Sequence, residues 1–283
     1  MSATQLDTAA VSPAVPARTA GGRRRLPRVG LGWRLLGIAV VLVAWQLAAL
    51  VVDSRGILPS PIEVARDFGF SFFDDAGLRY LGVKTPGYLP NLAYTIGASA
   101  LAWAIGSVLG AVVGLLSARI QLFRSVSEPL FFVFGAVPAL VLAPFFSVWF
   151  GQGLENKLVL VAFYCFVSVG LVAQSAAQAF PPSSEEYAAT QGLDARARFL
   201  HVLVPGTLPV VLAGLRIALA TAIAVQTTIE LLGSQFGAGR LIALRASQGD
   251  LSSIIGLSLA LGAIAVALDA LLRAIIRGIV RWQ

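Results

Sequence analysis

The chain has 283 residues, of which 57% are hydrophobic and 12% are charged. Soluble domains contain about 45–50% apolar and about 25% charged residues, so this composition excludes a water-soluble globule and indicates a protein buried in lipid. Cys165 and His201 are the single residues of their types, which excludes an intrachain disulfide and a His/Cys metal centre. The net charge of +7 agrees with the basic cytoplasmic loops of membrane proteins, so we expect contact with membrane lipid and none with nucleic acid.

Residues 1–30 combine Ser, Thr, Ala and Pro with an arginine cluster and lack an apolar period, which predicts a flexible basic cytoplasmic tail. The first apolar run follows at 35–52. It has two interpretations, a cleaved signal peptide or a retained membrane helix. The run is longer than the usual apolar region of a signal peptide and no clear cleavage site follows it, which favours retention.

Six predominantly apolar stretches are long enough to cross a bilayer core about 30 Å thick. They are continuous rather than alternating, which favours helices over the strands of a barrel. We therefore predict an all-α integral membrane protein in which residues 31–283 form the transmembrane domain. The predicted spans are 35–52, 92–118, 130–150, 158–180, 208–232 and 251–272.

The distribution of basic residues predicts the orientation of these spans. With the N-terminus inside, 14 of the 21 Lys and Arg residues fall on the inner side and 7 on the outer side. An excess of positive charge marks cytoplasmic loops, so we expect both termini in the cytoplasm. On the outer side, Leu58-Pro59-Ser60-Pro61 precedes an amphipathic pattern that predicts a short surface helix.

Small residues recur every four positions along the second predicted span. Gly106, Gly110 and Gly114 belong to this stripe, which lies on one helix face and permits close approach of another backbone. We interpret the stripe as a helix-packing surface, within the subunit or between two copies. A substrate path along it is the alternative.

The loop at 181–206 carries the strongest functional pattern. Two prolines end the preceding helix, and Ser183 with Glu186 forms a capping-box pattern that predicts the start of a short helix. Gly192 then allows the backbone to reverse, Asp194 is placed to cap a second short helix, and Pro205 is expected to end it. The small residues of the first helix, Ala188 and Ala189 among them, suit insertion into a groove on a partner.

This loop resembles the EAA loop of binding-protein-dependent ABC importer permeases, E-A-A-three-G-nine-I-x-L-P. Glu186, Ala188, Gly192 and Pro205 fall in register, while Tyr187 replaces an alanine. Further stretches are similar to the nitrate, sulfonate and taurine branch of that family. These are Leu58–Pro61, Glu128-Pro129 through Val137-Pro138 to Gly151 and Lys157, Gly214-Leu215-Arg216, and Gly237-Ala238-Gly239-Arg240-Leu241-Ile242.

The resemblance implies a type I importer in the bacterial inner membrane. Its permease pair, expected here to be a homodimer, works with a cytoplasmic ATPase dimer docked on the EAA loops and with an extracytoplasmic solute-binding protein. The ATPase-coupling residues would be Glu186, Ala188, Ala189, Gly192 and Pro205. The chain has no G-x-x-x-x-G-K-[ST] stretch, so we expect no catalytic residue, metal or cofactor in it, and ATP and Mg bound by the partner subunit.

Polar residues within the spans are candidates for the translocation path, because such groups are costly in lipid. The candidates are Arg216, Gln226, Glu230 and Gln174. Pairing or snorkelling is the alternative for Arg216, and Asp269 is spaced for a helical ion pair with Arg273. Glu230 falls near a helix end, so a solvated interfacial carboxylate is as plausible as a gate. Pro138 and Pro144 are expected to break regular bonding in the third span.

Two other functional classes would each require a pattern in the sequence. An ion-coupled secondary transporter predicts paired intramembrane carboxylates or inverted repeats, and an intramembrane enzyme needs a converging set of reactive side chains. Neither pattern is present in the sequence. The branch resemblance points to a small anionic solute, such as a sulfonate, taurine or nitrate, moved by alternating access.

Overall fold

The computed structural model describes residues 31–52, 57–151 and 153–279. The chain divides into two compact units, Met1–Ala44 and Trp45–Gln283, and helix α1 (Leu31–Val52) crosses the division. The first predicted span, 35–52, lies within α1, which is a continuous apolar helix. The predicted tail at 1–30 lies outside the described residues.

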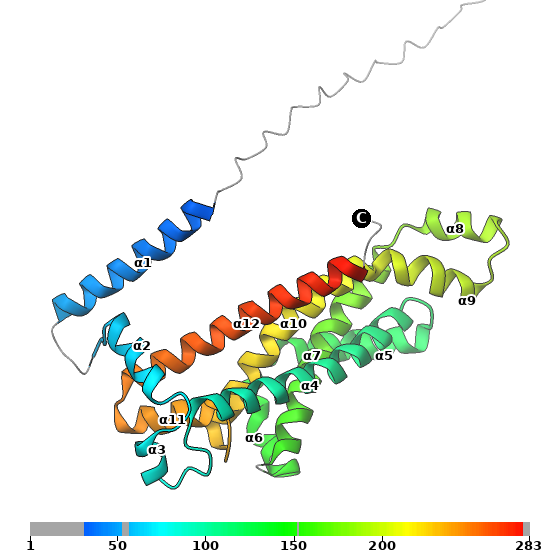
Figure 1. Ribbon diagram of the computed structural model, residues 1–283. Helices are drawn as coiled ribbons and strands as arrows, with labels where there is room; N and C mark the ends of the chain where they lie inside the picture. The colour runs from blue at the N-terminus through cyan, green and yellow to red at the C-terminus, as the bar shows by residue number, and fades with distance from the viewer. Residues whose placement is uncertain (1–30, 53–56, 152, 280–283) are drawn as a thin grey trace, which may run out of the picture. The chain divides into compact units, whose positions relative to one another are not determined.

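Four long helices form the body of the second unit (Figure 1). They are α4 (Tyr88–Leu116), α7 (Leu154–Gln178), α10 (Val204–Gly233) and α12 (Leu251–Ile279). The most extensive contact joins α4 and α7, and α7 also packs against α10 and two shorter helices. Leu160 and Cys165 of α7 share a buried cluster with Ala102 of α4 and Ala222 of α10. These helices contain the cores of the second, fourth, fifth and sixth predicted spans.

The third predicted span, 130–150, is broken rather than straight. Helix α5 (Gln121–Ala136) and helix α6 (Ala139–Phe150) meet at an angle of 105°. The break falls at Val137 and Pro138, because a proline forces the residue before it into an extended conformation, and Val137 has ψ 124°. Pro144 lacks an N–H and so removes one hydrogen bond from α6, but the helix continues through it, since one missing bond is tolerated inside a membrane helix.

The segment after α7 contains helix α8 (Pro182–Thr190), helix α9 (Ala195–Arg198) and the π-helical turn η1 (Phe199–Leu203). Ser183 is not the N-cap of α8. Pro181 holds that position and Pro182 starts the helix, because its fixed φ suits the first turn. Pro205 does not end α9 either. It lies in the first turn of α10, where no proline N–H is needed, and the π-turn carries the chain directly from α9 into α10.

Three shorter helices gather at the other end of the second unit (Figure 1). They are α2 (Pro61–Phe70), α3 (Ala76–Tyr80) and α11 (Ala238–Gln248). The predicted surface helix is α2. Its N-cap is Ser60, whose hydroxyl accepts from the Glu63 N–H at 3.2 Å while the Glu63 carboxylate accepts from the Ser60 N–H at 2.9 Å. We call this end of the unit the α11 end and the opposite one, which carries α8 and the turn between α4 and α5, the α8 end.

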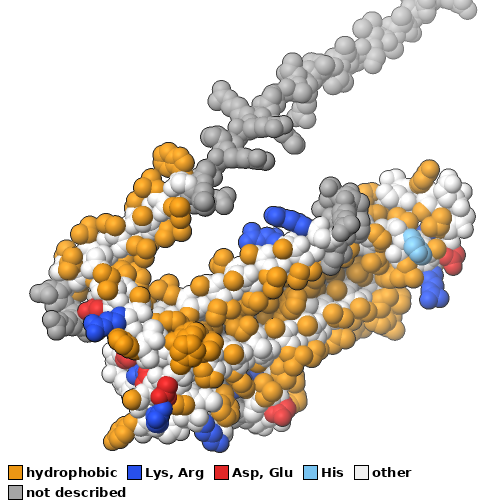
Figure 2. Space-filling view, in the orientation of Figure 1, with side chains coloured by type: hydrophobic (Ala, Val, Ile, Leu, Met, Phe, Trp, Pro, Cys, Tyr) orange, Lys and Arg blue, Asp and Glu red, His pale blue; other side chains and the backbone are white. Residues whose placement is uncertain are grey.

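The described residues form helices and no strand. Five of the helices are long and apolar enough to cross a membrane, and the bent pair α5–α6 brings the number to six if it counts as one span. Hydrophobic side chains cover the visible sides of the long helices, whereas charged side chains gather toward the ends (Figure 2). Exposed Leu101, Ile105 and Val108 of α4 belong to this apolar surface. Such a surface requires lipid or protein around it, which agrees with an all-α membrane protein.

Candidate functional site

Helix α8 projects most of its side chains into solvent. Glu186, Ala189 and Tyr187 are exposed, Tyr187 by 68%, whereas Ala188 is buried against the rest of the loop. Asp194 caps α9 as predicted, accepting from the Ala197 N–H at 2.8 Å. Helix α8 is thus held by its buried residue Ala188, and its opposite face is exposed.

Gly192 ends α8 by reversing the chain. Its φ of +83° belongs to the left-handed region that favours glycine. The N–H of Gly192 donates to Ala189 O at 3.0 Å and the N–H of Leu193 donates to Ala188 O at 3.2 Å, which is the Schellman pattern. No atom lies within 4 Å of a Cβ placed on Gly192, so the backbone conformation and not space requires glycine here.

An ion pair ties α8 to the end of α4. The Arg119 guanidinium lies 2.6 Å from the Glu185 carboxylate, and the two side chains are 27% and 22% exposed. The EAA pattern drew attention to Glu186, but the neighbouring Glu185 makes this contact. A partly exposed pair of this kind contributes at most about 1 kcal/mol, so its significance lies in connecting α8 with the turn that follows α4.

The glycine stripe of α4 lies directly against the α7 backbone. A Cβ on Gly106 would overlap Ala162 O, one on Gly110 would overlap Phe166 O, and one on Gly114 would overlap the carbonyl oxygen of Gly170. The two helices therefore approach more closely than any larger side chain allows.

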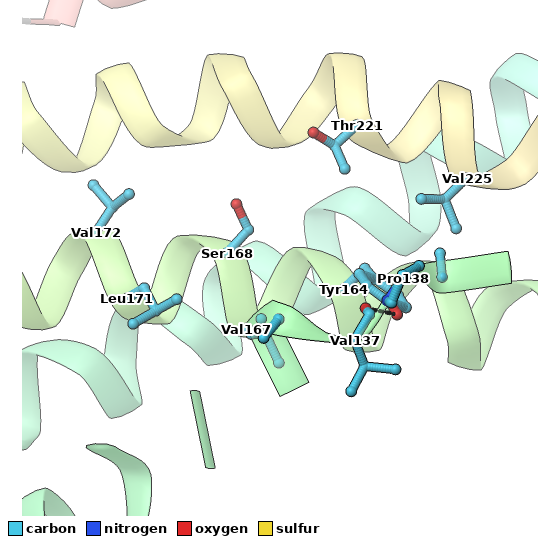
Figure 3. Close-up of a pocket in the computed structure, with 12 residues that line it drawn as sticks. Val137, Pro138, Tyr164, Val167, Ser168, Leu171, Val172, Thr221 and Val225 are labelled. Carbon is cyan, nitrogen blue, oxygen red and sulfur yellow. Dashed lines mark hydrogen bonds between the residues drawn. The ribbon is translucent and has the colours of Figure 1, made fainter. Parts of the chain in front are cut away.

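A cavity of about 580 Å³ lies beside the break between α5 and α6 (Figure 3). Val137 and Pro138 of the break form one wall, and Ser168 of α7 and Thr221 of α10 contribute hydroxyl groups. The break frees the Val137 carbonyl, which accepts a hydrogen bond from the Tyr164 hydroxyl at 2.6 Å. The other lining side chains are mainly apolar, so the cavity offers a shaped space with few polar contacts.

None of the four candidate path residues lines this cavity. Arg216 joins α10 to α12 through a bidentate pair with Asp269, at 2.8 and 3.1 Å, and Arg273 also contacts Asp269 at 3.0 Å. Gln174 is 4% exposed, and its Nε2 has no hydrogen-bond partner among the described residues. Ser168 and Thr221 were missed because hydroxyl groups within an apolar helix carry no distinguishing spacing.

Gln226 and Glu230 belong to a buried polar cluster at the α11 end. Glu230 is 1% exposed, so the expectation of a solvated interfacial carboxylate is wrong. Its oxygens accept hydrogen bonds from the Thr95 hydroxyl at 2.7 Å, the Gln226 amide at 2.8 Å and the Gly239 N–H at 3.0 Å. The Gly239 N–H belongs to the first turn of α11, where the helix dipole favours a negative charge.

The cluster explains the glycines of the Gly237-Ala238-Gly239 segment. A Cβ on Gly237 would overlap the Glu230 carboxyl group, and one on Gly239 would overlap Thr227 O. Gly237 also has φ +110°, and its N–H donates to Asn91 Oδ1 at 3.0 Å. The segment therefore closes over the carboxylate and docks α11 on α4 and α10.

A second ionic contact holds α3 to α11. Asp75 caps α3, accepting from the Leu78 N–H at 3.0 Å, and pairs with Arg245 of α11. Burial raises the pKa of Asp75, but hydrogen bonds from Ser71 and the Leu78 amide together with the Arg245 charge outweigh it, and the net pKa lies below the ordinary value. Asp75 and Arg245 are 170 positions apart in the chain, and no sequence pattern predicted that they would pair.

Comparison with known proteins identifies the class. The family model described as binding-protein-dependent transport system inner membrane component matches residues 85–283. The chain belongs to this family, and it is a permease subunit of an ABC importer and a multi-pass inner membrane protein.

Proteins with similar sequences are described as transport permeases. The chain is 26% identical over 200 residues to the formylaminopyrimidine transport permease protein ThiX of Halalkalibacterium halodurans, covering 71% of this chain and 75% of ThiX. It is 24% identical to the putative aliphatic sulfonates transport permease protein SsuC of Bacillus subtilis, covering 92% of each. It is 26% identical to the taurine transport system permease protein TauC of Escherichia coli, covering 87% of this chain and 88% of TauC.

Solved structures share the fold. An amino acid ABC transporter superposes with a TM-score of 0.59 at 16% identity, covering 71% of this chain and 96% of the other. The inward-facing MetNI methionine ABC transporter superposes with a TM-score of 0.56 at 19% identity, covering 71% and 98%. These likenesses support the type I permease architecture.

Proposed function

We propose that this permease imports a small anionic solute of the sulfonate, taurine or nitrate type by alternating access. Two copies of the chain form the membrane pathway, and both termini lie in the cytoplasm. A cytoplasmic ATPase dimer grips α8 and binds the ATP and Mg, and an extracytoplasmic solute-binding protein delivers the cargo to the α11 end. The names of SsuC and TauC support the substrate class.

The observation that carries the coupling proposal is the Arg119–Glu185 ion pair. It links exposed α8 to α4, α4 lies backbone to backbone against α7, and α7 lines the cavity at the α5–α6 break. A motor that displaces α8 therefore acts on the cavity through rigid contacts. The bent joint between α5 and α6 supplies an element that can take up the movement.

The docking role of α8 is tested with Glu186→Lys. Glu186 is exposed, so the substitution leaves the fold intact while reversing the charge presented to the ATPase. In the complex reconstituted with its ATPase and binding protein, we expect cargo-stimulated ATP hydrolysis to fall at least about tenfold, as loss of a charge-assisted contact allows. Glu128→Lys is the matched control, because Glu128 is exposed on α5 outside α8.

Two results would contradict the proposal. Full stimulation by the Glu186→Lys complex would remove the docking role of α8. ATP hydrolysis by the purified chain alone, without its partner subunit, would remove the assignment of the motor to another chain.

A further inference from the structure

A second cavity, of about 390 Å³, lies at the α11 end, away from the α5–α6 break. It is bounded by the first turn of α7, by Tyr94 of α4 and by the loop that joins α10 to α11. The lining residues are Tyr94, Gly153, Leu154, Lys157, Gln235 and Phe236. None of them was a candidate path residue, although Lys157 belongs to the stretch that resembles the importer family.

Lys157 is a buried cation on the wall of this cavity. Its side chain is 2% exposed and donates hydrogen bonds to the Ser234 hydroxyl and, at 3.3 Å, to the Tyr94 hydroxyl. The ammonium also lies 5.0 Å from the centre of the Tyr94 ring, a cation–π contact. These neutral partners orient the ammonium group but supply no opposite charge.

Within the described ranges, no carboxylate forms an ion pair with Lys157. The interaction of Glu230 with Lys157 is a longer-range electrostatic attraction, because the Glu230 oxygens already accept hydrogen bonds from Thr95, Gln226 and Gly239. A buried charge without an opposite charge costs several kcal/mol, and that cost is recovered when an anion binds beside it. The ammonium group of Lys157 has no counter-ion in the part of the chain that the structure describes, so the cavity suits an anionic ligand.

The remaining walls limit the size and shape of such a ligand. Tyr94 and Phe236 pack with their ring centres 5.8 Å apart and form an apolar side. The volume accommodates a compact solute of a few heavy atoms beyond its charged group. At the rim, Gln235 is exposed, and the exposed Glu155 carboxyl group lies beside Gly153.

We propose that this cavity is an anion-binding site in which Lys157 holds the sulfonate or carboxylate group of the cargo. The inference rests on the proposed function, because that function places the α11 end on the side from which the binding protein delivers the solute. Lys157 would form a charge-assisted hydrogen bond to the anion, and the aromatic pair would contact its apolar part.

The test measures binding of sodium ethanesulfonate to the purified permease–ATPase complex by calorimetry, without binding protein. Ethanesulfonamide, of nearly the same shape and neutral, is the paired probe. We expect at least tenfold preference for the sulfonate, a loss of that preference in Lys157→Met, and its retention in Lys157→Arg. Lys84→Met is the matched control, since Lys84 is an exposed lysine on the same side that does not line the cavity.

Substitutions at exposed Gln235 keep the test valid if Lys157→Met does not fold. Gln235→Lys should tighten ethanesulfonate binding about threefold or more and Gln235→Glu should weaken it by a similar factor, because each places a charge at the rim. Equal binding of the two probes, or unchanged ethanesulfonate binding in Lys157→Met and both Gln235 variants, would overturn the proposal.

The same complexes separate this inference from the proposed function. If the wild-type complex couples ATP hydrolysis to import of a sulfonate but its KM is unchanged in Lys157→Met, the anion site is wrong and the importer assignment stands. If the wild-type complex binds ethanesulfonate through Lys157 but imports no sulfonate, the proposed cargo is wrong and the site stands.

Discussion

The two ends of the permease use polar residues in opposite ways. At the α11 end, Glu230 is 1% exposed and all its contacts lie within the chain. At the α8 end, Glu186 and Tyr187 face solvent, and α8 is held by buried Ala188 and by the Arg119–Glu185 pair. One end is stabilised internally, whereas the other keeps its polar groups available to a partner. Substitutions at the two ends should therefore separate effects on folding from effects on coupling.

The largest effect on stability is expected for Glu230→Leu. The substitution leaves the Thr95 hydroxyl, the Gln226 amide and the Gly239 N–H without their acceptor in a buried site, which should cost about 3–5 kcal/mol. The midpoint of thermal unfolding in detergent micelles measures it. Thr228→Val on the same helix is the control, because Thr228 is partly buried and its hydroxyl donates to Ala224 O of its own helix. A loss below about 1 kcal/mol would show that the cluster does not hold the α11 end together.

A smaller effect, dependent on pH, is expected at Asp75. The lowered pKa means that the ionised group stabilises the fold above the ordinary value of 3.8, and that this contribution is lost as the pH falls through the lower pKa of the folded state. Asp75→Asn should cost about 1–2 kcal/mol at neutral pH and should flatten the loss of stability below pH 4. Unfolding midpoints across this pH range check it, with Asp74→Asn as the exposed control. An unchanged acid profile would exclude Asp75 as its source.

The smallest effect on stability is expected for Arg119→Ala at the α8 end. The partly exposed pair should contribute at most about 1 kcal/mol, yet its removal should reduce cargo-stimulated ATP hydrolysis, because α8 loses its tie to α4. Arg124→Ala is the control, since Arg124 forms an exposed pair with Glu128 on α5. The comparison between the two ends fails if Arg119→Ala unfolds the protein or if it leaves coupling unchanged.

Hydropathy predicted the long helices because an apolar run of about 20 residues has few alternatives to a membrane helix. Proline effects were harder to predict, since their outcome depends on position in the helix. Pro138 breaks a helix, Pro144 lies within one, and Pro205 begins one. Sequence alone does not separate these cases, because Pro205 follows a π-helical turn that the sequence pattern did not predict.

The buried contacts could likewise be predicted from the sequence only in part. The spacing of Gly106, Gly110 and Gly114 predicted a close helix contact, since a four-residue repeat stays on one helix face. The environment of Glu230 could not be predicted, because its partners come from three helices and include backbone N–H groups. Lys157 was noted only as part of a family-like stretch, since burial of a lysine near a helix start has no local signature.

The glycine contacts between α4 and α7 have a mechanical consequence. Where two helix backbones are in direct contact, no layer of side chains lies between them that could change rotamer as the helices slide. We therefore expect α4 and α7 to move as one rigid body. Bending within this pair would separate the α4 glycines from the α7 carbonyl oxygens against which they pack. The 105° bend at Val137–Pro138 lies outside this helix pair, so we expect a change of shape during transport to occur there more readily than within the pair.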